Sequence, residues 1–462
     1  MPLARWLIPD LAMAGALFTL GFLLLLFDGG HALFRDADAG WHVRNGERIL
    51  RERQLPRADP YSWSKPGEPW YAWEWGADVL TGAAHRAGGL GAVAWIYALA
   101  IACCTWLWFQ LTWNAGGNFL VACALASPML TAVNIHWLAR PHVFGWLFVL
   151  LSLLLIGRGE RRWLPWFALA ALWANVHASW FLLPALLAIH KRPAAIAAFA
   201  GTFLNPYGWH LHAHVLSYLR DTALLERIGE FQSFNFHSEG ALQIGTALLI
   251  SAGGAALLAA RRDWPRALTV LLFTAIALRS ARGLPLMALA ALPYANAALA
   301  AQNWPAAFRE YAANLRRHDA RFRGWLLAPA AALAALLWLL PRSGFPADVF
   351  PVQAASHLPA HTRLFAPDKF GGYLIYHFAG RERVFFDGRS DYYGADFLKR
   401  YIRMVQLRPG WREDWTRWRF HAALLPTDYS LNSVLPLLGW TETYRDGAAA
   451  VWLAPDRNNG DR

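Results

Sequence analysis

Long apolar segments limit how this chain can fold more than any other feature of its sequence. Eleven of them lie near residues 8–27, 88–112, 118–135, 141–157, 163–175, 178–190, 193–205, 241–260, 266–279, 284–300 and 324–341. A helix needs about 20 residues, with a range of about 17–25, to cross the hydrocarbon core of a bilayer. Since 56% of the 462 residues are apolar and 16% are charged, the sequence predicts a polytopic α-helical membrane protein with about eleven transmembrane helices.

The positive charge of the chain lies mainly in short loops. The formal net charge of +12 would suit nucleic acid, but the basic residues gather near 158–162, 191–192, 261–266 and 309–323. Cytoplasmic loops of membrane proteins carry such an excess of Lys and Arg. We therefore expect no nucleic acid partner and a cytoplasmic N-terminus. The same rule places the loop at 28–87 and the region after Arg342 on the outer side.

The stretch between Arg162 and Lys191 tests this topology, because both of its ends are basic. Two arms of about 13 residues would each rise roughly 20 Å at 1.5 Å per residue, short of the ~30 Å hydrocarbon core. The turn at 175–179 would then lie below the outer surface, against protein or a water-filled cavity. The alternative to this hairpin is one long tilted helix.

The last part of the chain lacks long apolar runs and is predicted to be a soluble α/β domain. Strands are expected at 363–365, 383–386 and 422–425, a helix at 396–407, and a hairpin at 441–454 that turns at Asp446-Gly447, a favoured turn pair. About 120 residues are enough to bury a core. The predicted domains are therefore a transmembrane domain at 1–341, with a long first external loop at 28–87, and an extracytoplasmic domain at 342–462.

Asp36 and Asp38 are the candidate catalytic residues. They follow the first apolar segment directly, in a stretch that continues to His42. Two carboxylates two residues apart can share a hard divalent cation such as Mg²⁺ or Mn²⁺, with His42 as a further ligand, or one of them can act as a base. The alternative is a solvated acidic loop. Their position at the bilayer edge favours function, since charged groups there usually face a cavity or a substrate path.

Aromatic and polar residues alternate between 60 and 75, and this segment includes Trp70, Trp73 and Glu74. Aromatic faces stack on sugar rings, and indoles also anchor proteins at the membrane interface. The three residues are therefore candidates for substrate binding, with interfacial anchoring as the alternative.

Three arginines at predicted outer turns are candidates for binding a phosphate. Arg140 lies close to two histidines, and Arg279 and Arg282 flank a very short turn. A guanidinium binds phosphate through two hydrogen bonds, and guanidiniums at membrane depth are costly unless an anion pairs with them. The alternatives are a lipid head-group contact for Arg140 and an internal salt bridge for the other two.

Two further elements supply substrate-binding candidates. His177 lies in the turn at 175–179, and Tyr207 lies in the segment 205–209, which ends a predicted helix at the outer face. In the C-terminal region, Asp387 and Arg389 follow a predicted strand and either bind substrate or fix a turn. We favour the structural role for this pair.

The sequence contains no G-x-x-x-x-G-K-[ST] loop, no H-E-x-x-H pair and no G-x-S-x-G elbow. A cytoplasmic nucleotide-driven pump and a serine hydrolase are therefore not expected.

These elements together resemble the GT-C superfamily of integral-membrane glycosyltransferases, in which the first external loop carries an acidic pair after the first helix. Asp36 and Asp38 occupy that position. The chain is similar throughout to bacterial membrane proteins with a D-x-D-x-G-W-H stretch, a W-x-N-x-H turn, an N-P-Y-G-W element and a terminal F-x-D-G-R segment. The matching residues are 36–42, 173–177, 205–209 and 386–389.

The resemblance implies transfer of a sugar from a polyprenyl-phosphate-linked donor to a glycan, lipid or protein acceptor. The site would lie on the outer face of a bacterial inner (cytoplasmic) membrane, with the C-terminal domain in the periplasm. One carboxylate of the acidic pair would deprotonate the acceptor or hold a divalent metal. Two alternatives remain: a non-catalytic protein that binds or translocates lipid-linked glycans, and a metal-independent polysaccharide ligase or polymerase.

Overall fold

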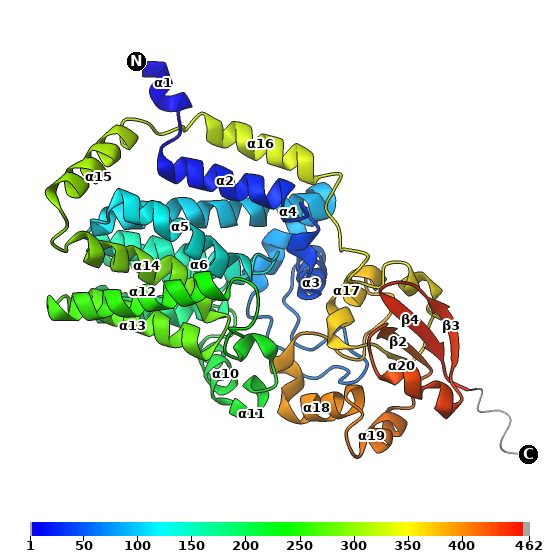
Figure 1. Ribbon diagram of the computed structural model, residues 1–462. Coiled ribbons are helices and arrows are strands. Elements are labelled where there is room, and N and C mark those ends of the chain that lie inside the picture. The colour runs from blue at the N-terminus through cyan, green and yellow to red at the C-terminus, as the bar shows by residue number, and fades with distance from the viewer. Residues whose placement is uncertain (1, 456–462) are drawn as a thin grey trace, which may run out of the picture. The chain divides into compact units, whose positions relative to one another are not determined.

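The computed structural model of the chain describes residues 2–455, which fall into two compact units (Figure 1). The first, which we call the helical unit, comprises the residues up to Gly29 together with 91–213 and 228–341. The second, the mixed unit, comprises 30–90, 214–227 and the residues from Arg342 onward.

Each of the eleven apolar segments contains a helix. These helices are α2 (Leu11–Leu25), α4 (Trp75–Ala115), α5 (Phe119–Asn134), α6 (His142–Gly157), α7 (Trp163–Ala174), η2 (Ala178–Phe181) with α8 (Leu182–Ile189), α9 (Ala194–Gly201), α12 (Ala241–Ala260), α13 (Trp264–Arg279), α14 (Gly283–Ala300) and α16 (Leu327–Leu339). The helical unit also holds α1 (Pro2–Leu7), η3 (Gly229–Phe231), α15 (Ala306–Asp319) and the start of α10 (Trp209–Arg220). A helix satisfies its own backbone hydrogen bonds, which is why apolar segments adopt it.

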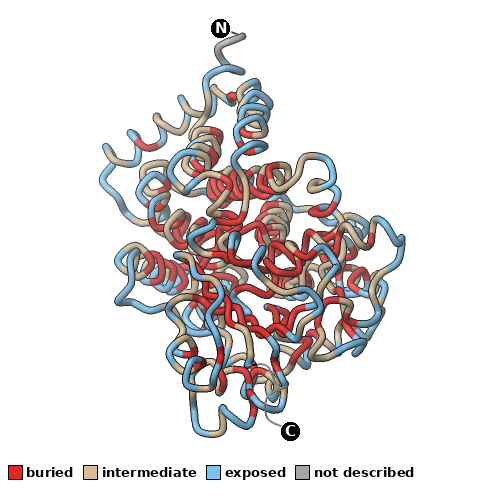
Figure 2. Tube along the Cα trace, turned by 90° about the vertical axis from the view of Figure 1, so that its right-hand side faces the viewer, coloured by how far each residue is buried: buried red, intermediate tan, exposed pale blue. Residues whose placement is uncertain are grey.

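Three of the described helices, α4, α12 and α14, are long and apolar enough to cross a membrane. α14 is well enclosed, with 83% of its most apolar window buried, and Figure 2 colours buried residues red. The other apolar helices are shorter. The number of about eleven crossings therefore stays a prediction.

The stretch between Arg162 and Lys191 does not form one long helix. α7 ends at Ala174, and the backbone is extended at His177, with φ −157° and ψ 143°, before η2 begins. The chain is thus broken at the predicted turn, and the alternative of a single tilted helix is wrong.

The mixed unit contains a four-stranded sheet in the order β1-β2-β4-β3. Its strands are β1 (Leu364–Phe365), β2 (Ala422–Pro426), β3 (Thr441–Arg445) and β4 (Ala449–Leu453). β1 runs parallel to β2, and the other two pairs are antiparallel. Its helices are η1 (Ala32–Phe34), α3 (Asp38–Glu52), α11 (Thr222–Leu225), η4 (Ala354–His357), α17 (Asp368–Phe378), α18 (Ser390–Val405), α19 (Trp411–Trp418), α20 (Leu431–Val434) and η5 (Pro436–Leu438).

Most elements predicted for the C-terminal region are confirmed. The strands near 364 and 422 and the hairpin are present, and the side chain of Asp446 accepts hydrogen bonds from the backbone N–H groups of Ala448 and Ala449, each 2.8 Å long, which fixes the turn. The predicted helix lies within α18, which begins earlier, at Ser390. The predicted strand at 383–386 is wrong, because only an isolated bridge joins Val384 to Ser62.

Close backbone contact joins the first loop to the C-terminal region. A Cβ atom added at Gly40 of α3 would lie 2.2 Å from the carbonyl oxygen of Gly372 in α17, and one added at Gly372 would lie 2.2 Å from that of Ala37. Only glycine permits such an approach. The sequence assigned this loop to the transmembrane domain, whereas the structure groups most of it with the C-terminal region.

Gly40→Ala should lower the stability of the mixed unit by about 1–3 kcal/mol, the usual cost of inserting a methyl group into a close-packed contact. Thermal unfolding of the detergent-purified chain measures this. Gly447→Ala is the matched control, since a Cβ atom there would meet nothing within 4 Å. An unchanged melting temperature for Gly40→Ala would show that α3 and α17 are not in contact.

Candidate functional site

Asp36 and Asp38 lie at the N-terminal end of α3. The side chain of Asp36 accepts a hydrogen bond of 2.8 Å from the backbone N–H of Asp38, and Asp38 stands in the first turn, 7% exposed. Negative charge is favourable at a helix N-terminus, where unpaired N–H groups carry partial positive charge. The position of both carboxylates beside the first turn of α3 is therefore electrostatically favourable.

Asp38 packs against the F-x-D-G-R segment. A Cβ atom at Gly388 would lie 2.0 Å from Oδ1 of Asp38, so this glycine leaves the space that the carboxylate occupies. Gly371 of α17 similarly approaches the carbonyl oxygen of Phe386, at 2.1 Å from an added Cβ atom. The two segments that carry the family resemblance thus lie side by side within the mixed unit.

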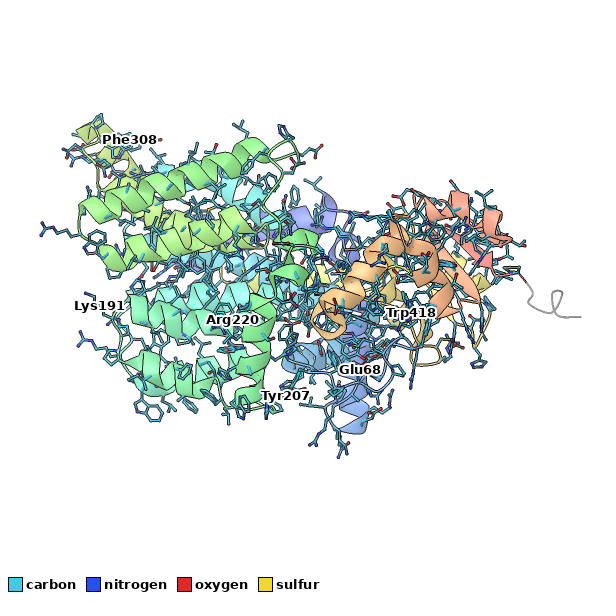
Figure 3. The ribbon with its side chains drawn as sticks, turned by 90° about the horizontal axis from the view of Figure 1, so that it is seen from below. Glu68, Lys191, Tyr207, Arg220, Phe308 and Trp418 are labelled. Carbon is cyan, nitrogen blue, oxygen red and sulfur yellow. The ribbon has the colours of Figure 1, made fainter. Side chains whose placement is uncertain are left out.

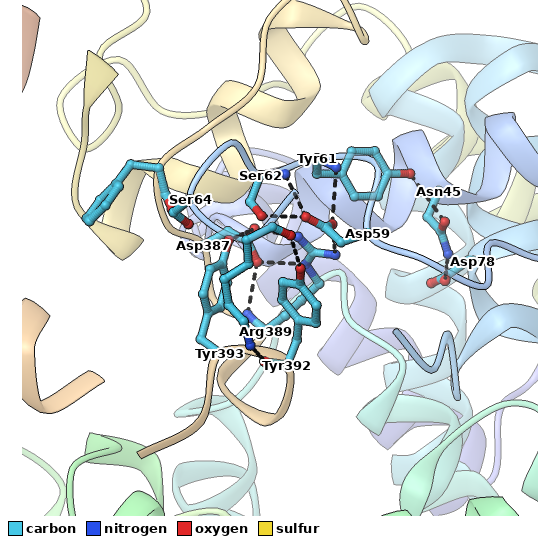
Figure 4. Close-up of polar contacts among 12 residues, drawn as sticks. Asn45, Asp59, Tyr61, Ser62, Ser64, Asp78, Asp387, Arg389, Tyr392 and Tyr393 are labelled. Carbon is cyan, nitrogen blue, oxygen red and sulfur yellow. Dashed lines mark hydrogen bonds and ion pairs between the residues drawn. The ribbon is translucent and has the colours of Figure 1, made fainter. Parts of the chain in front are cut away.

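A buried ion cluster fixes the F-x-D-G-R segment to the first loop (Figure 4). Arg389 lies 2.8 Å from Asp59 and 2.7 Å from Asp387, and all three side chains are at most 2% exposed. Tyr393 donates a hydrogen bond of 2.9 Å to Asp387, and Ser62 donates one of 2.5 Å to Asp59. We call Asp59, Ser62, Asp387, Arg389 and Tyr393 the Arg389 cluster. It confirms the structural role favoured for Asp387 and Arg389.

Electrostatics keep this cluster charged despite its burial. Burial opposes the charge of Asp59, yet the Arg389 guanidinium lowers the pKa of that carboxyl below its ordinary value. Burial likewise opposes the charge of Arg389, but Asp387 and Asp59 raise its pKa well above the ordinary value. A buried charge is stable only when it is paired and hydrogen-bonded in this way.

Trp70 is part of this structural core. It is 4% exposed, and the Arg389 guanidinium lies 4.6 Å from the centre of its ring. Trp73 lies elsewhere in the mixed unit, with its ring edge toward His214 at 5.0 Å and Tyr218 at 5.6 Å. The two predicted sugar-stacking residues therefore have different surroundings, and their role in binding stays a prediction.

A second buried network links α3 to the start of α4. Nδ1 of His42 lies 2.5 Å from Oδ1 of Asp78, and Asn45 donates a hydrogen bond of 2.6 Å to the other oxygen of that carboxyl. Tyr61 in turn donates to Asn45 at 3.2 Å (Figure 4). Nε2 of His42 lies 3.8 Å from Glu74, whose side chain is 13% exposed. The sequence pointed to His42 and Glu74 as candidates but assigned no role to Asp78, which fixes the orientation of the imidazole.

The predicted divalent metal stays a prediction. Among the described residues there is no group of three or more His, Cys, Asp or Glu side chains placed to hold a metal ion. Mg²⁺ keeps several water molecules and is commonly held by one or two carboxylates. Asp36 and Asp38 suit that mode of binding, while His42 is turned toward Asp78.

The predicted phosphate-binding arginines lie in the helical unit, where two of them share one carboxylate. Arg140 lies 3.2 Å from Glu230, and Arg282 forms a salt bridge with the same side chain. Burial opposes the charge of Glu230, but Arg282 and Arg140 lower its pKa below the ordinary value. Sequence reasoning missed Glu230, although it is the one acidic residue of the polar-aromatic segment 230–237.

The remaining candidates of the helical unit have the following surroundings. Arg279 is the last residue of α13 and is exposed. Nδ1 of His177 lies 2.7 Å from the hydroxyl of Ser179, and the backbone N–H of Tyr207 donates to the side chain of Asn205 at 2.8 Å. Their role in substrate binding stays a prediction. Figure 3 labels Tyr207 among the side chains.

The chain shares its fold with solved structures of a membrane-bound oligosaccharyltransferase, in agreement with the fold expected from the sequence resemblance. The chain is similar to the archaeal oligosaccharyltransferase AglB from Archaeoglobus fulgidus in complex with an inhibitory peptide and a dolichol-phosphate, with a TM-score of 0.55 at 12% identity over 90% of this chain and 69% of the other. A structure of the Archaeoglobus fulgidus oligosaccharyltransferase tethered to an acceptor peptide gives 0.54 at 12% identity, over 90% and 68%.

ArnT from Cupriavidus metallidurans, bound to undecaprenyl phosphate, overlaps 98% of this chain and 99% of its own, with a TM-score of 0.43 at 13% identity. No family model matches the sequence, and no curated protein matches it. At these identities the likeness concerns the fold alone.

Acid should destabilise the Arg389 cluster. Because the pKa of Asp59 is lowered on folding, its stabilising contribution is present above the ordinary carboxyl pKa and is lost as the pH falls through the folded value. Asp59→Asn, which leaves Arg389 without one partner, should cost about 3–5 kcal/mol at neutral pH. Between pH 6 and pH 3, the melting temperature of Asp59→Asn should fall less than that of the parent chain.

The exposed Asp348 offers a control, since Asp348→Asn removes a carboxyl that has no role in the cluster. That variant should melt like the parent chain at both pH values. If the melting temperatures of the parent and of Asp59→Asn fell equally between pH 6 and pH 3, the Arg389 cluster would not be the cause of the loss of stability in acid.

Proposed function

We propose that the chain is a GT-C-type glycosyltransferase that moves a sugar from a polyprenyl-phosphate-linked donor to an acceptor outside the cytoplasm. The observation that carries the proposal is the shared fold with the oligosaccharyltransferase AglB over 90% of this chain. That protein was captured with a dolichol-phosphate and an inhibitory peptide, which represent a lipid phosphate and an acceptor. Three helices able to cross a membrane support a location where such lipids are found.

The acidic pair supplies the base in this proposal. An acceptor hydroxyl loses its proton to a carboxylate of Asp36 or Asp38 as its oxygen bonds to the anomeric carbon of the donor sugar. The bond from that carbon to the phosphate oxygen breaks, and the lipid phosphate leaves with the electron pair. Asp38 lies in the first turn of α3, where a negative charge is favourable, and Asp36 is the more exposed of the two. A carboxylate base contributes typically 10²–10⁴-fold to such a step.

The Arg-Glu-Arg group of the helical unit is the proposed binding group for a lipid phosphate. Arg140 and Arg282 together carry two positive charges against the single negative charge of Glu230. A guanidinium can bind a phosphate through two parallel hydrogen bonds, which is why these two arginines are the proposed phosphate ligands. Arg279, exposed at the end of α13, adds a further cation to the same unit.

The acidic pair also provides a place for a divalent cation. If Mg²⁺ or Mn²⁺ binds, Asp36 and Asp38 are the residues that hold it, and the ion supplies charge stabilisation for the leaving phosphate. We place the protein in the bacterial inner membrane, with the mixed unit on the periplasmic side.

Asp36→Asn and Asp38→Asn test the catalytic role. In proteoliposomes supplied with a panel of radiolabelled polyprenyl-phosphate sugars and envelope acceptors, at least one variant should lose about 10²–10⁴-fold in transfer rate, because an amide accepts no proton. Binding of the lipid should change little. Asp348→Asn, an exposed aspartate of the same unit, is the control.

Two outcomes of the same experiment separate the alternatives. Full transfer by both asparagine variants would reject the acidic pair as catalytic. Lipid binding without transfer in the parent chain would favour a protein that binds or translocates lipid-linked glycans. Treatment with EDTA then distinguishes metal-dependent transfer, which should stop, from a metal-independent ligase or polymerase, which should continue.

A further inference from the structure

The mixed unit contains a cavity that none of the preceding chemistry uses. It has a volume of 210 Å³ and lies between α18, α19 and the loop residues Ser64 and Lys65. Figure 1 labels the two helices, and Figure 3 labels Trp418. None of the candidate catalytic or phosphate-binding residues lines it.

The inner wall of this cavity is aromatic. Phe397 and Trp418 are partly exposed, and behind them lie Phe385 and Tyr401, which are buried. Tyr401 donates a hydrogen bond of 2.7 Å to Asp368 and its ring packs on Phe386 at 4.4 Å, so the accessible aromatic surface belongs mainly to Phe397 and Trp418. Aromatic faces of this kind are suited to stacking against the C–H faces of a sugar ring.

The rim of the cavity is positively charged. Lys65, Arg400 and Arg417 supply three cations against the single carboxylate of Asp396. Lys65 pairs with Glu68 at 2.9 Å. Within the part of the chain that the structure describes, Arg400 and Arg417 are exposed and have no ion pair or hydrogen bond of their own. Two guanidiniums at the mouth of an aromatic cavity can bind one acid group through ion pairs and hydrogen bonds.

The volume sets the size of the ligand. At ~30 Å³ for each water molecule of liquid, the cavity has room for roughly seven waters. Drug-sized ligands occupy sites of about 300–1,000 Å³. The cavity therefore has room for a single hexose ring, and the rest of a larger ligand would extend out of its mouth.

We propose that this cavity binds one sugar residue that carries an acid group, either a carboxylate or a phosphate. The aromatic wall receives the ring, and Arg400 and Arg417 bind the acid group. If the proposed transferase function is right, this residue belongs to the acceptor glycan, which would then be an acidic polysaccharide or oligosaccharide.

Ligand-observed NMR on the detergent-purified full chain tests this, with D-glucuronate, glucose 6-phosphate and glucose as probes. We expect saturation transfer to glucuronate, to glucose 6-phosphate or to both, and at least about tenfold weaker binding of glucose. The preferred acid probe identifies the acid group. Arg400→Gln and Arg417→Gln should each weaken that binding about tenfold.

Arg412→Gln is the matched control, because Arg412 is an exposed arginine of α19 that does not line the cavity. Equal binding of glucose and of both acid probes, no binding of any probe, or an equal loss in Arg412→Gln would overturn the proposal. These readouts need no catalysis. A failure of transfer therefore leaves the binding site intact, and a failure of binding leaves transfer to a neutral acceptor intact.

Discussion

The pairing of Arg389 with two carboxylates is the interaction on which the mixed unit depends. Asp387 is its neighbour, but Asp59 is 330 residues away in the sequence, so this ion pair holds the first loop to the C-terminal region. Backbone hydrogen bonds of 2.9 Å between Trp63 and Val384 and between Val384 and Tyr61 run beside it. Removing Arg389 would leave two buried carboxylates without their cation, and removing Asp59 would leave Arg389 with Asp387 as its remaining carboxylate partner in the cluster. The surroundings of Asp38 are therefore built by two distant parts of the chain.

Hydropathy and local turn chemistry predicted most of the elements. Apolar segments became helices because their backbone has few other ways to satisfy its hydrogen bonds, and Asp446-Gly447 made the expected turn. The strand predicted at 383–386 was wrong, because the aromatic residues of this segment are buried by side-chain packing around Phe385 and Phe386 and not by pairing in a sheet. Periodicity cannot distinguish these two forms of burial.

The sequence predicted several residues of the candidate site, but it did not predict which residues they contact. The early aspartates were identified by their place after the first apolar segment, and Arg140, Arg279 and Arg282 by their position at predicted outer turns. Their shared partner Glu230, and the contact of Asp78 with His42, have no sequence signal, because each pair is formed by tertiary structure. The same holds for the cavity between α18 and α19, whose lining comes from four separate segments.

The central claim is that a lipid-linked sugar is consumed and not merely bound. The most direct measurement is the release of free polyprenyl phosphate from a synthetic polyprenyl-phosphate sugar by the purified chain in proteoliposomes with envelope acceptors. The account predicts one lipid phosphate released for each sugar that appears on the acceptor. Recovery of the donor intact, whether bound to the protein or moved to the other leaflet, would contradict it.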